Sequence, residues 1–305
     1  MALSLQMKKF INSEHVGNYA PVMLPGFPDK KGEATPEEAR IHYLEAGEGE
    51  PLILIHTIGQ SLYTWRNAFQ ILSEYYRVLA IDLLGHGYSS RPIQFDYTIP
   101  EHSETLRLFM DAIGLESAHI VAFSAGALYA LDLVAKNPDR VGRVIIVSPG
   151  GITREMPLAV RMLDSALLGG LACRLYNRRT VERVLSACYF DLTTLDSEVL
   201  DNYYATIVDT YSRRAIQLCV ANLDETEAER SLRFIEHDVL ILWGAEDKWH
   251  PTAMSELYHA TLVNAKSSVI RNVGHLLHEE KGRRFVEATL EFIPASVDTP
   301  GKSRP

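Results

Sequence analysis

The chain has 305 residues, of which 47% are hydrophobic and 23% are charged, the composition of an ordinary globular protein. Its formal net charge of -9 disfavours nonspecific binding to nucleic acid, and no basic stripe reverses this. The cysteines, Cys173, Cys188 and Cys219, form no CxxC pair and indicate neither a zinc site nor a disulfide framework. No window approaches 18 uninterrupted apolar residues, and the amino terminus lacks the order of a signal peptide. We therefore expect a cytoplasmic protein with buried free thiols and no membrane span.

Short apolar runs alternate with helical segments from about residue 51 onward. Because they are apolar at consecutive positions, these runs predict strands buried on both faces. They are 51–55, 77–81, 119–123, 144–147 and 238–243. Between them, residues 98–113 and 125–136 have helical spacing. The alternation predicts an α/β fold with a mostly parallel, doubly wound sheet, in which the chemistry lies beyond the carboxyl ends of the strands.

The alternation stops between about residues 150 and 236, where helical patterns rich in Leu, Ala and Arg contain no convincing strand. We interpret 151–236 as a helical lid inserted into a core made of 39–150 and 237–294. Residues 1–38 form an N-terminal extension, and we expect 295–305 to be a disordered tail.

A candidate nucleophile lies at the end of the run 119–123. The segment Ala122-Phe123-Ser124-Ala125-Gly126 differs from the G-x-S-x-G nucleophile elbow only by Ala in place of the first Gly. In that elbow the serine sits on a strained strand-to-helix turn, where helical N–H groups favour developing negative charge. A turn of small residues that only packs a helix on a strand explains the motif equally well.

Two later motifs supply partners for Ser124. Asp247 follows a buried strand, where it can hold an imidazole in one tautomer, and Glu246 is the competing carboxylate. His275 follows the short strand 268–270, where it can take the proton of the serine, with His250 and His278 as rivals. The chain order Ser, Asp, His is that of the α/β-hydrolases.

The stretch 82–90, DLLGHGYSS, has the D-x-x-G-x-G-x-S pattern. Together with the serine, aspartate and histidine motifs, it resembles the α/β-hydrolase superfamily over roughly residues 40–293. The resemblance implies a serine hydrolase with the triad Ser124, Asp247 and His275, and it assigns His86 a structural role.

The oxyanion hole is expected to consist of backbone N–H groups. One is that of Ala125, and the other, in the loop after the first core strand, is that of Ile58. Relatives carry His-Gly in this loop, whereas this chain has His56-Thr57. Thr57 either changes the shape of the hole or adds a hydroxyl donor to the site.

Within the superfamily, residues 148–152 and 189–200 are similar to the meta-cleavage-product C–C hydrolases. Three features depart from that branch. The position of that branch's lid arginine falls near Tyr203 in this chain. Leu276 stands where the branch carries an aromatic residue beside the catalytic histidine, and the branch's glycine-rich HGGG loop is absent. Without an arginine fork a planar carboxylate loses its bidentate partner, so an apolar ester, lactone or thioester fits better.

The candidate substrate-binding residues are Thr57, Phe123, Tyr203, Trp249 and Leu276. Packing of the lid on the core explains most of the other apolar lid candidates at least as well. They are Met156, Met162, Leu167 and Leu168. No GxGxxG after a strand and no HExxH is present, so we expect neither cofactor nor metal. Ser124 in place of an aspartate excludes the haloalkane dehalogenase-like and epoxide hydrolase-like branches.

The sequence thus predicts a serine hydrolase that acts on a small-molecule acyl substrate through an acyl-enzyme, as a monomer or homodimer. Three alternatives stay open. They are C–C bond hydrolysis, a biosynthetic acyl transfer or cyclisation in which the lid excludes water, and a non-catalytic ligand-binding role on the same fold.

Overall fold

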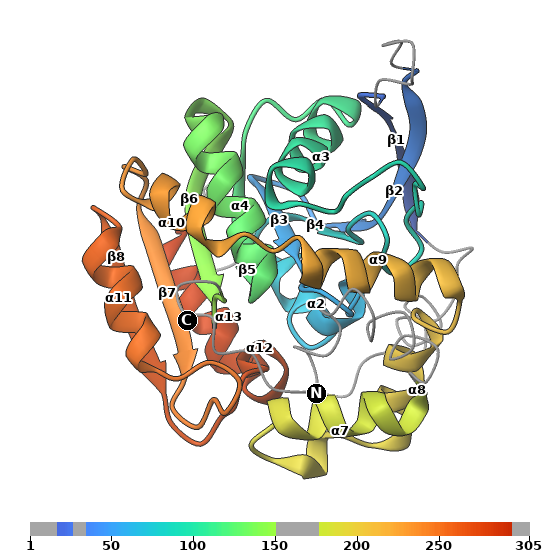
Figure 1. Cartoon of the computed structure of the whole chain (residues 1–305). Helices are drawn as coiled ribbons and strands as arrows, with labels where there is room; N and C mark the ends of the chain where they lie inside the picture. The colour runs from blue at the N-terminus through green and yellow to red at the C-terminus, as the bar shows by residue number, and fades with distance from the viewer. Residues whose placement is uncertain (1–16, 27–34, 151–176, 295–305) are drawn as a thin grey trace.

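The computed structural model describes residues 17–26, 35–150 and 177–294 (Figure 1). Its centre is an eight-stranded sheet with the order β1-β2-β4-β3-β5-β6-β7-β8. The strands are β1 Asn18–Leu24, β2 Glu37–Ala46, β3 Pro51–Ile55, β4 Arg77–Ile81, β5 Ala118–Phe123, β6 Val141–Val147, β7 Val239–Gly244 and β8 Ala265–Ile270. From β4 to β8 every neighbouring pair is parallel, so the predicted mostly parallel sheet is confirmed.

Helices cover both faces of this sheet, and short 3-10 turns (η) join some of the elements. The helices and turns are η1 Leu62–Trp65, α2 Phe69–Leu72, α3 Ile99–Ala112, α4 Ala125–Lys136, η2 Pro138–Arg140, α7 Arg178–Cys188, η3 Leu192–Thr194, α8 Ser197–Ala205, α9 Thr210–Ala221, α10 Glu225–Leu232, α11 Ala253–Thr261, α12 Leu277–Glu280 and α13 Gly282–Phe292. None of the helices in the described ranges combines the length and apolar character that a membrane span needs.

Alternate side chains of β3 enter two different hydrophobic clusters. Ile53 and Ile55 pack with the cluster that contains α3 and α4, whereas Leu52 and Leu54 pack with the cluster that contains η1, α2 and α13. A strand whose two faces are both buried must be apolar at every position, which is why the sequence pattern identified this strand.

The N-terminal boundary predicted at residue 38 is wrong, because β1 and the start of β2 belong to the sheet. These two strands pair antiparallel, and β2 pairs antiparallel with β4. In β1 the buried side chains alternate with exposed ones. Such alternation is typical of a strand with one solvent-exposed face, and a search for continuous apolar runs does not detect it.

Helices α7 to α10 lie in sequence between β6 and β7, within the predicted insertion. Figure 1 shows α7 and α8 beyond the ends of the parallel strands, whereas α10 lies beside α4. The insertion therefore returns to the core before β7 begins. Cys188 and Cys219 are free and buried. The start of the predicted insertion and the predicted tail lie outside the described residues, as do the candidates Met156, Met162, Leu167 and Leu168 and the residue Cys173.

A buried carboxylate joins the insertion to the core. Glu279 forms an ion pair with Arg66, with 2.6 Å between Oε2 and Nη2. It also accepts a hydrogen bond from the Thr64 hydroxyl at 2.6 Å. The hydroxyls of Tyr189 and Tyr203, both from the insertion, also donate to it. Burial alone would raise the pKa of Glu279, but Arg66 and its other donors hold the pKa below its usual value. Glu279 is therefore a buried anion that depends on its partners.

Replacing Arg66 by Leu is expected to lower the free energy of unfolding by about 3–5 kcal/mol, because it leaves the Glu279 charge buried and unpaired. Urea denaturation of wild type and variant measures the difference. Arg178→Leu is the control, since the Arg178–Asp201 pair is exposed and its loss is expected to cost less than about 1 kcal/mol. Equal losses in the two variants would contradict a special role for the buried pair.

Candidate active site

Ser124 occupies a strained turn between a strand and a helix. It lies between the last residue of β5 and the first residue of α4, with φ 53 and ψ -121. A non-glycine residue with positive φ is uncommon and costs about 1–3 kcal/mol, so the surrounding structure must enforce it. The backbone N–H of Ser124 donates to Val147 O at 2.9 Å, and its carbonyl accepts from Ala127 N at 3.0 Å. The turn that the elbow motif predicts is thus present.

Gly126 allows the start of α4 to approach the loop after β3. A Cβ atom at this position would lie 2.2 Å from the carbonyl oxygen of His56, which is too close for any side chain. The second glycine of the motif is therefore needed for packing. Ala122, the position that departs from the motif, is fully buried within β5, where its methyl group fits.

Asp247 and His275 follow neighbouring strands, β7 and β8, and form a hydrogen-bonded pair. His275 Nδ1 lies 2.8 Å from Asp247 Oδ2, and both side chains are buried. The other carboxylate oxygen accepts the backbone N–H groups of Trp249 and His250 at 2.8 and 2.9 Å. Burial alone would raise the pKa of Asp247, but the His275 imidazole and these N–H groups hold the pKa below its usual value. The carboxylate thus stays ionised and fixes the imidazole.

The rival residues have other partners. Glu246 accepts the backbone N–H of Val273 at 3.0 Å, and His278 Nε2 lies 2.6 Å from the Thr64 hydroxyl. His250 lies edge-on to the His275 ring, at 4.9 Å between centroids, with its Nδ1 at 3.3 Å from Ser148 O. The geometry therefore pairs Asp247, and not Glu246, with His275.

The hydrogen bond between Ser124 and His275 is not formed in this structure. Ser124 makes no side-chain hydrogen bond to His275 within the described ranges, although the ring of the preceding residue, Phe123, lies 4.8 Å from the His275 ring. Catalytic hydrogen bonds are often long in substrate-free proteins and tighten in the complex. The triad as a whole therefore stays a prediction.

The predicted substrate-binding residues differ in their surroundings. Trp249 is partly exposed and stacks on the His275 ring at 6.2 Å, as a residue beside the site should. Phe123 and Leu276 are fully buried, and the Phe123 ring packs against His275. Tyr203 is also buried and its hydroxyl binds Glu279. Substrate contacts by these residues stay predictions, and only the placement of Trp249 favours one.

Glu280 is a residue that the sequence analysis missed. One of its carboxylate oxygens accepts the backbone N–H of Gly274, beside His275, at 2.8 Å. The other accepts the N–H groups of Phe190 and Asp191, from the insertion, at 3.0 and 2.8 Å. The backbone N–H of His275 itself donates to Cys188 O at 2.8 Å. The loop that carries the candidate base is therefore attached to the insertion, and no sequence pattern signals a single bridging carboxylate.

The expected oxyanion donors lie in the loop after β3 and at the first residue of α4, which contacts this loop. The backbone N–H of Ala125 donates to the hydroxyl oxygen of Thr57 at 3.1 Å. His56 Nε2 accepts from Leu83 N at 2.9 Å, so its Nδ1 carries the proton and donates to Thr57 O at 2.7 Å. Burial lowers the pKa of His56, which keeps the ring neutral in this role. Ile58, the other expected donor, follows directly in the same loop.

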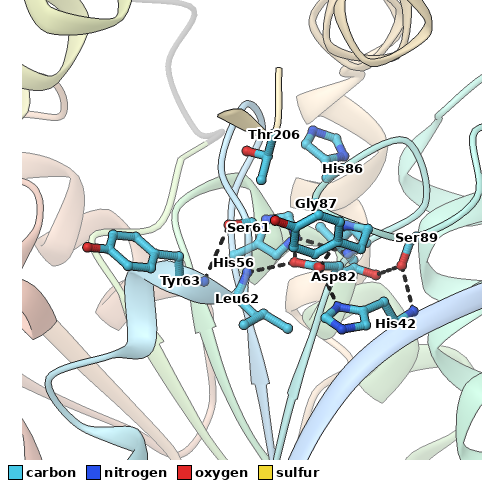
Figure 2. A network of polar contacts seen from close by, with 12 residues as sticks. His42, His56, Ser61, Leu62, Tyr63, Asp82, His86, Gly87, Ser89 and Thr206 are labelled. Carbon is cyan, nitrogen blue, oxygen red and sulfur yellow. Dashed lines mark hydrogen bonds and ion pairs between the residues drawn. The ribbon is translucent and has the colours of Figure 1, made fainter. Parts of the chain in front are cut away.

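The same loop is held from below by the buried carboxylate of Asp82 (Figure 2). Its Oδ1 accepts the N–H of Leu62 at 2.8 Å, and its Oδ2 accepts from His42 Nδ1 at 2.7 Å and from Tyr88 N at 2.9 Å. Burial opposes ionisation, but the hydrogen bond and charge of His42 lower the pKa of Asp82. In this network His86 lies near His56, at 5.4 Å between ring centroids, and its Nδ1 lies 3.1 Å from Leu84 O.

Comparison with known proteins agrees with this geometry. The model of the alpha/beta hydrolase fold family matches residues 50–282. The chain belongs to this family. It is 26% identical, over 83% of its length and 91% of theirs, to a 2-hydroxy-6-oxononadienedioate/2-hydroxy-6-oxononatrienedioate hydrolase of Comamonas testosteroni and to a 2-hydroxy-6-oxo-6-phenylhexa-2,4-dienoate hydrolase of Burkholderia cepacia. The predicted similarity to meta-cleavage-product hydrolases is thus confirmed.

The fold of this α/β hydrolase also matches solved structures. A meta-cleavage product hydrolase from Pseudomonas fluorescens IP01 superposes with a TM-score of 0.73 at 23% identity, over 83% of this chain and 94% of that one. An enol-lactonase from Burkholderia xenovorans LB400 superposes with a TM-score of 0.72 at 21% identity, over 83% and 96% of the two chains. At these identities the superpositions show the fold alone.

The α/β hydrolase is expected to lose stability steeply below pH 6.5. Burial lowers the pKa of His86 and of His278 to about 3 and that of His250 to about 4. Unfolding frees these rings to take up protons below their usual pKa of about 6.5, so acid favours the unfolded chain. Above that pH these rings do not lower the free energy of unfolding. Below it, each ring lowers the free energy of unfolding by on the order of 1 kcal/mol per pH unit, until the pH reaches the pKa of the ring in the folded protein.

Urea midpoints between pH 7.5 and 4.5 measure this loss. His278→Gln is expected to flatten the acid limb, whereas His259→Gln is the control and should leave it unchanged, because His259 is exposed in the folded protein. A midpoint that does not change with pH would show that these rings are not buried neutral groups.

Proposed function

We propose that this α/β hydrolase is a serine hydrolase that acts through an acyl-enzyme, with Ser124 as nucleophile, His275 as base and Asp247 as the partner of the base. The observation that carries the proposal is the strained Ser124 turn at the sheet edge where Asp247 and His275 form their hydrogen-bonded pair. A strained backbone at a helix start, at the same end of the sheet as an oriented imidazole, is the arrangement that an activated serine nucleophile needs.

In the proposed mechanism each group has one role. Asp247 binds Nδ1 of His275, which leaves Nε2 to accept the Ser124 proton as the hydroxyl attacks the acyl carbon. The negative charge on the acyl oxygen is stabilised by the N–H groups of Ala125 and Ile58. His275 then gives the proton to the leaving group, and water releases the acyl group by the same steps. The helical insertion acts as a lid over this edge.

The preferred substrate is an apolar ester, lactone or thioester. The aromatic rings beside His275 are those of Phe123, His250 and Trp249. None of them offers a positive charge to a carboxylate near neutral pH, because burial lowers the pKa of His250 to about 4. Arg66, a buried cation near the insertion, is already neutralised by Glu279. An acyl group without a second carboxylate therefore suits the described surroundings.

The second candidate is hydrolysis of the C–C bond of a 2-hydroxy-6-oxo-dienoate. The similarity to the Comamonas and Burkholderia hydrolases, which extends over 83% of the chain, favours it. Both reactions can use the same three residues, so the substrate and not the triad separates them.

Ser124→Ala is expected to abolish labelling by a fluorophosphonate probe and to lower p-nitrophenyl hexanoate hydrolysis by about 10³-fold or more, because no other group replaces the nucleophile. Ser148→Ala is the matched control. Ser148 directly follows β6, also has positive φ, and is buried. Loss of labelling in Ser148→Ala and not in Ser124→Ala would overturn the assignment. A protein that is labelled but turns over none of a panel of esters, thioesters and dienoates would favour the ligand-binding alternative.

The substrate class is tested by comparing kcat/KM for p-nitrophenyl hexanoate, a medium-chain lactone and 2-hydroxy-6-oxo-6-phenylhexa-2,4-dienoate. We expect the ester or lactone to exceed the dienoate, since a single lost ion pair to a carboxylate is worth about 10-fold or more. A dienoate preferred over both would establish the second candidate. Reaction in oxygen-labelled water shows whether every product acid carries the label, as hydrolysis requires and acyl transfer does not.

A further inference from the structure

The N–H group on which the proposed oxyanion hole depends has a side-chain partner. Ala125 N donates to Thr57 Oγ1 at 3.1 Å, and both residues are buried. The acceptor is the side-chain hydroxyl of Thr57, so a residue without a hydroxyl at this position would leave the Ala125 N–H without this partner. The hydroxyl therefore lies at the place where the substrate carbonyl must bind.

The position of this hydroxyl is fixed by its surroundings. The carbonyl oxygen of Thr57 accepts from His56 Nδ1 at 2.7 Å and from Gln60 N at 3.3 Å, so the backbone of the loop is held on both sides. On the other side, Gly126 packs α4 against the His56 carbonyl without room for a Cβ atom. Because loop and helix are locked together, Thr57 Oγ1 stays beside the Ala125 N–H, and only its proton is free to rotate.

That proton has no acceptor within the described part of the chain, although buried hydroxyls normally have one. A substrate oxygen that binds the Ala125 N–H comes into contact with Thr57 Oγ1, since both oxygens then share one donor. Two oxygens in contact attract each other only when one donates a proton to the other. We propose that the Thr57 hydroxyl donates a hydrogen bond to the oxyanion, as a catalytic residue in addition to the two backbone N–H groups.

This inference rests on the proposed acyl-enzyme mechanism. As Ser124 Oγ bonds to the acyl carbon, its proton passes to His275, and the electron pair of the C=O bond moves onto the oxygen. The oxyanion accepts from Ala125 N–H, Ile58 N–H and Thr57 O–H, and the Thr57 proton stays on its own oxygen. When the tetrahedral species collapses, the pair returns to the C=O bond, the bond between the acyl carbon and the leaving group breaks, and the leaving group takes the proton from His275. A hydroxyl bound to an anion forms a short, strong bond, so its effect is largest in the transition state.

The test compares Thr57→Val, which keeps the shape, with Thr57→Ser, which keeps the hydroxyl, on p-nitrophenyl hexanoate. Thr57→Val is expected to lower kcat by about 10–100-fold with little change in KM, because it removes one oxyanion donor. Thr57→Ser should stay close to wild type. A trifluoromethyl ketone with the same alkyl chain forms an oxyanion on the serine. Its Ki should rise in Thr57→Val by the factor by which kcat/KM falls.

Thr289→Val, which removes a buried hydroxyl from α13, is the control for a general effect of losing such a group. Thr57→Ala is the second variant in case Thr57→Val does not fold, and it should show the same loss. Activity of Thr57→Val or Thr57→Ala equal to or above wild type would overturn the inference, as would an equal loss in Thr57→Ser. Full turnover by Ser124→Ala would overturn the proposed function together with the inference, whereas an inactive Ser124→Ala with an unimpaired Thr57→Val overturns the inference alone.

Discussion

The close contact between the start of α4 and the carbonyl of His56 is the constraint on which the site depends. It requires glycine at position 126, and it brings the loop after β3 against the turn that carries Ser124. The positive φ of Ser124 is unfavourable by itself and persists because β5 and α4, on its two sides, are buried in the core. The loop after β3 and the Ser124 turn are therefore positioned by the same packing, and a change at either one is transmitted to the other.

Carboxylates hold the loops that follow the strands. Asp82 binds backbone N–H groups of the segments after β3 and β4, Asp247 binds those of its own loop, and Glu280 binds the loop after β8. Loops lack the regular hydrogen bonds of strands and helices, so their buried N–H groups need other acceptors. An ionised carboxylate can accept several such groups and binds them more strongly than a neutral oxygen. The functional edge of the sheet is thereby kept rigid without secondary structure.

Sequence patterns predicted the parts of this molecule that repeat, and failed where the information lies in single contacts. Strands buried on both faces, such as β3 and β5, were found because every position is apolar, whereas β1 was missed because only alternate side chains are buried. The motif around Ser124 predicted its turn because the strain demands small neighbours. Glu280 and the Thr57 contact with Ala125 were not predictable, since both depend on how distant segments meet after folding.

The attachment of the His275 loop to the insertion bears on how the site reaches its active geometry. The backbone N–H of His275 is bound to Cys188, at the end of α7, and Glu280 ties Gly274 to the residues that follow. Glu279 binds the same insertion through Tyr189 and Tyr203. A displacement of α7 relative to the sheet therefore acts directly on the loop that carries the imidazole. Ser124, by contrast, is fixed within the core. The distance between Ser124 and His275 therefore depends on how the insertion sits on the sheet.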